Sequence, residues 1–248
     1  MVVRFGVQIA ALVLALPFAA GAVADESGQI RTDLFPGLFE KLENDVELQA
    51  LWGSCPADIY RREAAFWASY IDNPDVKVEQ CETDPAGCHA KCIQARNENA
   101  CFSLGRALQS NLEEEYSRHW EALFARACAT GSAGGCTNRG AGIRNGRYPD
   151  DPFMAKPEDV RDACLFRTFE TSCSADDAWG CAMHGQSYLL GEGVAEDPVK
   201  AAEFFQKSCE IAPEFAACDY AKVQLQEIDS APLAEQWLKR LMSVFSPE

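Results

Sequence analysis

Cysteine is the residue type in this chain with the most capacity for chemistry. Twelve of the 248 residues are cysteine, an even number well above ordinary usage, and three are histidine. This density is typical of either zinc sites or a set of disulfide bonds in an oxidising compartment. Local pairs of zinc ligands are offered by Cys88, His89 and Cys92, and by Cys181 and His184. The regular spacing of the cysteines favours disulfides instead, so we expect no metal, no other cofactor and no catalytic cysteine.

Eight of the cysteines form four close pairs that recur along the chain. The pairs are Cys92 with Cys101, Cys128 with Cys136, Cys173 with Cys181, and Cys209 with Cys218. Their first members are 36, 45 and 36 residues apart, which is the period of a helical repeat with one insertion. The insertion lies between Arg147 and Asp159, where Pro149, Pro152 and Pro157 interrupt any helix. We expect it to be a lengthened loop.

Between one pair and the next, the sequence has the pattern of two helices separated by a polar or glycine-rich turn. Residues 181–190 and 198–209 are such helices, and Asp197 is placed to cap the second of them. Each cysteine pair then joins the end of a second helix to the start of the next first helix. Antiparallel helix ends can approach to the Cα separation of about 5.5 Å that a disulfide needs. Each such bridge would contribute on the order of 2–3 kcal/mol. The predicted fold class is all-α, an α/α solenoid of helix pairs stapled by disulfides.

The repeat resembles the Sel-one-like repeat (SLR), which is related to the tetratricopeptide repeat. The resemblance rests on residues 182–194, AMHGQSYLLGEGV, followed by Asp197, Lys200, Ala201, Phe204 and Phe205. In that family a glycine in the first helix, here Gly185, allows close packing, and a later Gly-x-Gly ends that helix. Copies with cysteines at their ends resemble the cysteine-rich secreted bacterial proteins of the Hcp type, whose bridges link consecutive helices. The match is strongest over residues 181–218 and covers about half of the chain.

Atypical segments are expected on both sides of the repeats, because terminal repeats need a polar outer face. We predict an N-terminal helical cap over residues 25–80, a cysteine-rich repeat region over 81–228 and a C-terminal capping helix over 229–248. The cap has apolar residues at helical spacing, among them Leu34, Phe35, Leu38, Phe39, Leu42, Val46, Leu51, Ile59, Phe66, Trp67, Tyr70 and Ile71. The closing helix follows a turn at residues 229–232 and turns Leu233, Trp237, Leu241 and Val244 inward.

Four cysteines remain outside the repeating pairs. They are Cys55, Cys81, Cys88 and Cys164, which allow three connectivities. We expect Cys81 to pair with Cys88, and Cys55 with Cys164. Cys88 and Cys92 also lie one helical turn apart, so an exchange of partners between them stays open.

The first residues have the pattern of a secretory signal peptide. An arginine precedes an apolar run over residues 5–20, and residues 22–24, Ala-Val-Ala, form a small-x-small cleavage site. As a membrane anchor the run is short, and Gln8 and Pro17 interrupt it. We therefore expect cleavage after Ala24, no membrane span in the mature chain, and a periplasmic or secreted location.

The charge balance excludes one class of partner. The chain has 38 acidic and 22 basic residues, a formal net charge of -16. Cleavage after Ala24 removes Arg4 and no acid, which leaves 38 acidic and 21 basic residues and a net charge of -17. Nucleic-acid binders need a basic surface, so nucleic acid is excluded. We expect a monomer whose partner is a protein or peptide of basic character.

The leading functional hypothesis is a scaffold that binds a protein or peptide on its first helices. Helical phase suggests that outward-facing residues on those helices contact the partner, namely Arg106, Gln109, Arg139, Arg144 and Gln186. The Hcp-type resemblance implies an alternative, an enzyme that binds or hydrolyses β-lactams. However, no serine is followed by lysine at the third position, and His89, His119 and His184 form no His-x-His cluster. Residues 185–187, Gly-Gln-Ser, lack the second glycine of a nucleophile elbow. No catalytic residue is therefore predicted.

Overall fold

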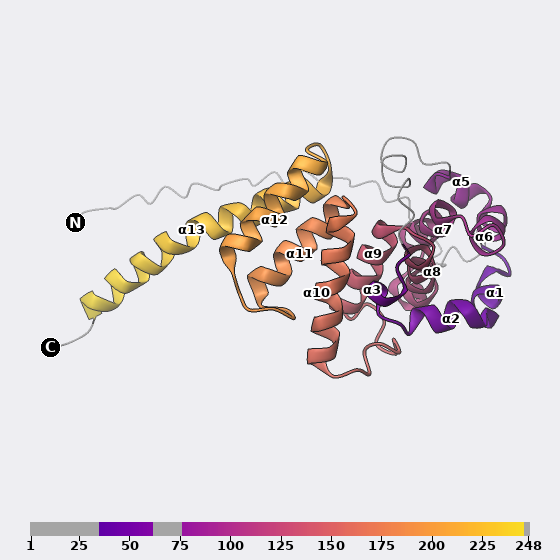
Figure 1. Ribbon diagram of the computed structural model, residues 1–248, viewed down its shortest axis with the longest axis horizontal. Coiled ribbons are helices and arrows are strands. Elements are labelled where there is room, and N and C mark those ends of the chain that lie inside the picture. Colours follow the sequence, from indigo (N-terminus) through magenta and orange to yellow (C-terminus); the bar gives the residue numbers. More distant parts are fainter. Residues whose placement is uncertain (1–34, 62–75, 246–248) are drawn as a thin grey trace, which may run out of the picture. The chain divides into compact units, whose positions relative to one another are not determined.

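Every regular element in the described part of the chain is a helix (Figure 1). The computed structural model describes residues 35–61 and 76–245, with side chains described as far as residue 230. None of the helices described there is both long and apolar enough to cross a membrane. The predicted signal peptide, residues 25–34 and residues 62–75 lie outside the described residues, as do the side chains of the predicted C-terminal stripe. The helices are α1 Leu38–Asn44, α2 Val46–Trp52, α3 Pro56–Ile59, α5 Val78–Thr83, α6 Pro85–Ile93, α7 Glu98–Asn111, the 3-10 helix η2 Glu114–Tyr116, α8 Ser117–Ala129, α9 Ala133–Arg144, α10 Glu158–Ser174, α11 Ala178–Leu190, α12 Pro198–Ile211 and α13 Ala216–Phe245.

Helices that follow one another in the chain pack against one another (Figure 1). The pairs α7–α8, α9–α10 and α11–α12 each continue into the next helix through contacts of α8 with α9, α10 with α11, and α12 with α13. Among the first helices, α11 contacts both α9 and α13. Before the pairs, α2 packs on α8, and α3 packs on α8, α9 and α10. The fold is therefore an all-helical, repeat-like succession of helix pairs.

One glycine–phenylalanine contact recurs in three consecutive helix pairs. In each pair the glycine follows the first helix's cysteine by four residues, and the phenylalanine precedes the second helix's cysteine by four. A Cβ added to the glycine would lie 2.8, 2.9 or 3.0 Å from the nearest ring carbon, so only a residue without a side chain allows this approach. The pairs are Gly105 with Phe124, Gly140 with Phe169, and Gly185 with Phe205.

The turns between the pairs also repeat. Disulfides join Cys92 to Cys101, Cys128 to Cys136, Cys173 to Cys181, and Cys209 to Cys218, with Cα–Cα distances of 4.3–4.6 Å. Each bridge links the end of one helix to the start of the next, in the pairing that the spacing predicts. At the first three joints the side chain of Asn97, Ser132 or Asp177 caps the next helix by accepting one of its backbone N–H groups. The residue before each cap has a positive φ.

Two further disulfides tie the N-terminal part of the fold together. Cys81 and Cys88 link α5 to α6, with their Cα atoms 5.5 Å apart. Cys55 and Cys164 link the start of α3 to α10 across 109 residues of sequence, with their Cα atoms 5.9 Å apart. Both pairs agree with the sequence expectation, so all twelve cysteines are in disulfides.

Asp177, the cap of α11, makes the stability of the fold depend on pH. Burial raises the pKa of this carboxyl from 3.8 to about 6, although Thr137 and the N–H groups of Gly180 and Trp179 oppose the rise. Because the folded-state pKa is raised, the protonated carboxyl contributes its full stabilisation below about pH 4. This contribution of Asp177 is lost as the pH rises through 6. The loss amounts to about 3 kcal/mol, since one pKa unit equals about 1.4 kcal/mol.

Asp177→Asn should therefore flatten the stability profile between pH 4 and pH 7, because the amide oxygen keeps the cap without a charge. Chemical denaturation at several pH values, with the disulfides intact, measures this. Asp197→Asn changes the partly exposed cap of α12 and is the matched control. An unchanged slope in Asp177→Asn would show that this carboxyl does not cause the pH dependence.

The segments around the repeats differ from the sequence expectations. The apolar residues predicted at helical spacing from Leu34 to Leu51 do not form one helix, because the side chain of Asp45 accepts the N–H of Leu48 and starts α2. This break turns Val46 outward, where it is 82% exposed. The expected turn at residues 229–232 is wrong, because α13 runs without a break from Ala216 to Phe245. The expected boundary after residue 80 falls inside α5.

Candidate functional site

Arg139, which the sequence places on an outward face, is fully buried. Its guanidinium binds both carboxylate oxygens of Asp151, at 2.5 and 2.7 Å, and donates to the backbone oxygen of Trp52 at 2.8 Å. It also lies 3.3 Å from the carboxylate of Glu121 on α8. The expectation that Arg139 contacts a partner is therefore wrong. Helical phase failed here because the insertion loop carrying Asp151 folds back over this face of α9.

Glu121 completes a group of four charges, of which all but Arg147 are buried. Its second oxygen accepts a hydrogen bond from Arg147 at 2.5 Å, so two arginines face two carboxylates with no net charge. Burial raises the pKa of Glu121, while Arg139 and Arg147 oppose that rise. A Cβ on Gly142 would lie 2.1 Å from this carboxylate, so glycine is needed beside it. This group of charges, which we call the Arg139 network, joins α2, α8, α9 and the insertion loop.

Arg144 and Gln186, two other predicted contact residues, meet in one polar site. Arg144 at the end of α9 donates to the side-chain oxygen of Gln186 at 2.8 Å and to the hydroxyl of Ser187 at 2.8 Å. It also binds both carboxylate oxygens of Glu192, one of them at 3.0 Å. The guanidinium lies over the ring of Phe169, 4.3 Å from its centroid. We call Arg144, Gln186, Ser187 and Glu192 the Arg144 cluster.

The turn after α11 brings Glu192 into this cluster. Gly191 ends the helix with a φ of 69°, as the Gly-x-Gly pattern predicts, and the N–H of Glu192 returns to the backbone oxygen of Ser187 at 2.9 Å. Gly193 packs so tightly on α10 that a Cβ there would lie 2.4 Å from the backbone oxygen of Asp162. Sequence reasoning missed Glu192 as a site residue, although its place between the two glycines signals a fixed position.

The Arg144 cluster has part of the arrangement of a nucleophile and its base. The Ser187 hydroxyl lies 2.9 Å from a carboxylate oxygen of Glu192. Arg144 binds both oxygens of Glu192, so the carboxylate is held as an ion pair instead of standing free to take the serine proton. The arrangement therefore suits polar recognition better than nucleophilic chemistry. Both charged side chains are partly accessible, at 10% for Arg144 and 13% for Glu192.

Two of the three histidines contact aromatic or acidic side chains. His184 is buried against the rings of Phe166, Tyr188 and Phe204, and burial lowers its pKa to about 4, so it is neutral at neutral pH. His119 lies 3.0 Å from the carboxylate of Glu43, and it links α8 to α1. Among the described residues, no group of three or more potential ligands gathers at a distance suited to a metal ion.

Arg106 and Gln109, the remaining predicted contact residues, lie on α7 and are partly exposed. The guanidinium of Arg106 donates to the side-chain oxygen of Gln109, so they satisfy each other. Their role in partner binding stays a prediction, as it does for Arg144 and Gln186.

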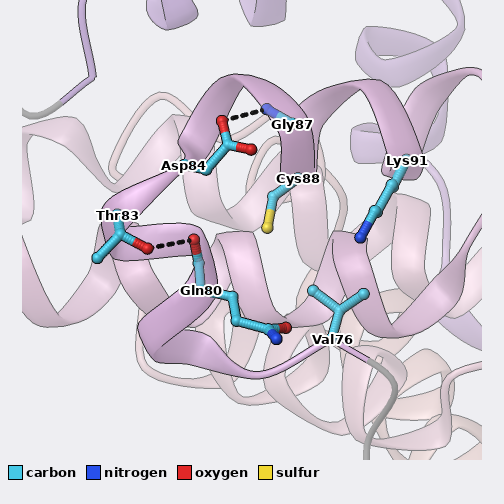
Figure 2. A pocket seen from close by; sticks show the side chains of 7 residues that line it. All are labelled: Val76, Gln80, Thr83, Asp84, Gly87, Cys88 and Lys91. Carbon is cyan, nitrogen blue, oxygen red and sulfur yellow. Dashed lines mark hydrogen bonds between the residues drawn. The ribbon is translucent and has the colours of Figure 1, made fainter.

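A cavity of about 290 Å³ lies between α5 and α6 (Figure 2). Two of its polar side chains are engaged locally. Asp84 accepts the N–H of Gly87 at 2.9 Å, and Thr83 donates its hydroxyl to the backbone oxygen of Gln80 at 3.1 Å. Figure 2 shows Lys91 on the opposite side of the cavity from Thr83. This cavity is small and open, and its two charged side chains are Lys91 and Asp84, of which Asp84 is engaged in capping α6.

A second cavity, of about 320 Å³, lies over the Cys55–Cys164 disulfide. Its lining combines apolar and charged side chains, namely Ile59, Phe153 and Val160 with Asp58, Lys156 and Arg167. Asp58 and Arg167 form an ion pair at 2.7 Å across the cavity rim, and both side chains are about half exposed.

Comparison of the chain with protein-family models, with curated proteins and with solved structures gave no match.

Proposed function

We propose that this chain is a periplasmic or secreted scaffold, a solenoid of Sel-one-like helix pairs that binds a basic protein or peptide. The observation that carries the proposal is the recurrence of one packing unit in three consecutive helix pairs. Each unit has a capped, disulfide-closed joint and a glycine–phenylalanine contact at the same positions relative to its cysteines. Repeated units that contact only their neighbours are the basis of solenoid scaffolds.

Contacts between first helices support a shared binding face. Because α11 touches both α9 and α13, first helices would form one row, as they do on the inner face of a solenoid. The Arg144 cluster bridges two members of this row, α9 and α11. Its hydrogen bonds hold the side chains of neighbouring repeats in fixed positions, which lowers the entropy lost on binding.

The charge distribution favours a basic partner. Residues 158–229 contain 15 acidic and 5 basic residues, a net charge of -10 out of the -16 of the whole chain. Eleven of these acids are exposed, namely Glu158, Asp159, Glu170, Asp176, Glu196, Glu203, Glu210, Glu214, Asp219, Glu227 and Asp229. The negative electrostatic field of these side chains accelerates the association of a positively charged partner. This effect weakens as the salt concentration rises.

The proposed location rests on the disulfides and on the signal-peptide pattern. Six disulfides persist only where thiols are oxidised, which favours a compartment outside the cytosol. This agrees with cleavage after Ala24.

A matched pair of charge variants tests the acidic surface. We expect Glu203→Gln with Glu210→Gln and Glu214→Gln to slow association with a lysine- and arginine-rich peptide at least several-fold at low salt. The control replaces Glu113, Glu114 and Glu115 with glutamine, which changes the net charge equally on an exposed segment far along the chain. Stopped-flow association at several salt concentrations is the measurement.

Equal slowing in both variants would mean that only the total charge matters, and an association rate that does not change with salt concentration would contradict the proposal.

Incubation with a chromogenic β-lactam is a separate test of the scaffold function. A scaffold should give no turnover, whereas turnover that Ser187→Ala abolishes would replace the scaffold by an enzyme.

A further inference from the structure

The Cys55–Cys164 disulfide differs from the other five in three respects. It connects residues 109 positions apart, whereas the others span 7–9 residues. Both of its cysteines line the cavity of about 320 Å³. Among the disulfides in the described part of the chain, it alone has a sulfur within hydrogen-bond distance of a cationic side chain. Arg167 Nη2 is 3.7 Å from Cys55 Sγ.

We propose that this disulfide is a thiol–disulfide exchange site, reduced selectively by a thiol reductant that enters through the cavity. The surroundings stabilise a thiolate on Cys55. Arg167 supplies a positive charge, which it shares with the carboxylate of Asp58 at 2.7 Å, and Lys156 adds a second cation to the lining of the same cavity. Thr168 adds a hydroxyl whose oxygen accepts the N–H of Ala57 at 3.3 Å. This oxygen lies 3.9 Å from each of the two sulfurs, so its proton can face whichever one carries the charge.

The exchange step balances with a dithiol as the reductant. The reductant's thiolate forms a new S–S bond with Cys164 Sγ, the Cys55–Cys164 bond breaks, and its electron pair leaves on Cys55 Sγ as a thiolate. The reductant's second thiolate then displaces Cys164, which takes up a proton as a thiol. The dithiol is oxidised to a disulfide, and the cystine gains two electrons. A leaving thiolate of lower pKa departs faster, which is the contribution of Arg167.

Reduction would release one specific contact. The bond ties α3 to α10, while α2 remains held through the backbone oxygen of Trp52 and Arg139. Opening the bond therefore removes the covalent tie between α3 and α10, leaves their hydrogen bond (Ala57 to Thr168) and ion pair (Asp58 with Arg167), and keeps the joints between the helix pairs closed.

Limiting dithiothreitol, followed by timed alkylation and peptide mass mapping of the full mature protein, tests the selectivity. We expect Cys55 and Cys164 to be alkylated first, before any other cysteine. Cys209 is the strongest competitor, because it is partly exposed. Alkylation of Cys209 and Cys218, or of another pair, at the same early times would overturn the proposal.

Arg167→Gln tests the role of the cation. The reduction rate of this disulfide should fall by roughly threefold, and Arg167→Lys should keep most of the rate. Arg161→Gln removes the same charge from the same helix, where Arg161 contacts the sulfur of Met154, and is the control. A variant that merely unfolds would be reduced faster, the opposite of the expected change. Equal rates in both glutamine variants would contradict the assignment.

Discussion

Replacing Arg139 with methionine is expected to lower the free energy of unfolding by about 3–5 kcal/mol. The side chain is fully buried and binds Asp151, Glu121 and the backbone oxygen of Trp52. Methionine fills much of the same volume but leaves the buried carboxylate of Asp151 without its guanidinium. Arg147 still contacts Glu121, so the larger part of the loss should come from Asp151. Guanidinium denaturation at pH 7, with all disulfides intact, measures the change.

Arg106→Met is the matched control for this prediction. Arg106 is partly exposed and donates to one neutral side chain, Gln109, so its loss should change stability by about 0.5 kcal/mol or less. Removing both charges, by Arg139→Met with Asp151→Leu, should recover part of the stability lost in the single variant. If Arg139→Met and Arg106→Met cost the same, the Arg139 network does not hold the fold together.

Gly180→Ala is expected to lower the free energy of unfolding by about 2–3 kcal/mol, through overpacking at a joint. An added Cβ would lie 2.6 Å from the Cβ of Ser172 and 2.9 Å from the backbone nitrogen of Cys173. Backbone atoms at the end of a disulfide-closed helix cannot move aside cheaply. Gly135, at the same position of the preceding joint, is as tightly packed, with Ala127 Cβ 2.7 Å from the added atom.

The joint lengths explain why glycine stands there. Where the two cysteines are eight residues apart, the residue before the second cysteine is Gly135 or Gly180; where they are nine apart, it is Ala100 or Ala217. In both shorter joints there is no room for a methyl group at this position, because the added Cβ would lie 2.8 or 2.9 Å from the backbone nitrogen of the first cysteine. Gly53→Ala is the control, since its added Cβ would meet Pro152 at an ordinary 3.5 Å. Thermal melts in which both variants lose equal stability would contradict the loop-length explanation.

The sequence predicts the local part of this fold well. The four repeating cysteine pairs are close in sequence, so their spacing alone indicates which helix ends meet. The cap at Asp197 and the helix end at Gly191 follow from equally local rules, because each depends on a side chain or glycine within a turn of its partner.

Non-local contacts account for what the sequence could not predict. Arg139 looks exposed by helical phase, and only the return of the insertion loop with Asp151 buries it. The Arg144 cluster combines residues from α9, α11 and the following turn, so no single segment reveals it. The break at Asp45 is a short-range exception: the apolar spacing continued through a residue whose side chain caps a new helix.

The long Cys55–Cys164 bond imposes an order on oxidative folding. Cysteines emerge in chain order during synthesis, and if Cys55 and Cys164 are set aside, every other native bond joins two consecutive cysteines. Early pairing of Cys55 with Cys81 would shift each later bond by one cysteine, as far as Cys164. Only the last two bonds, Cys173–Cys181 and Cys209–Cys218, would escape. Correct maturation therefore requires Cys55 to stay reduced until α10 is made, or a disulfide isomerase to correct the shifted set.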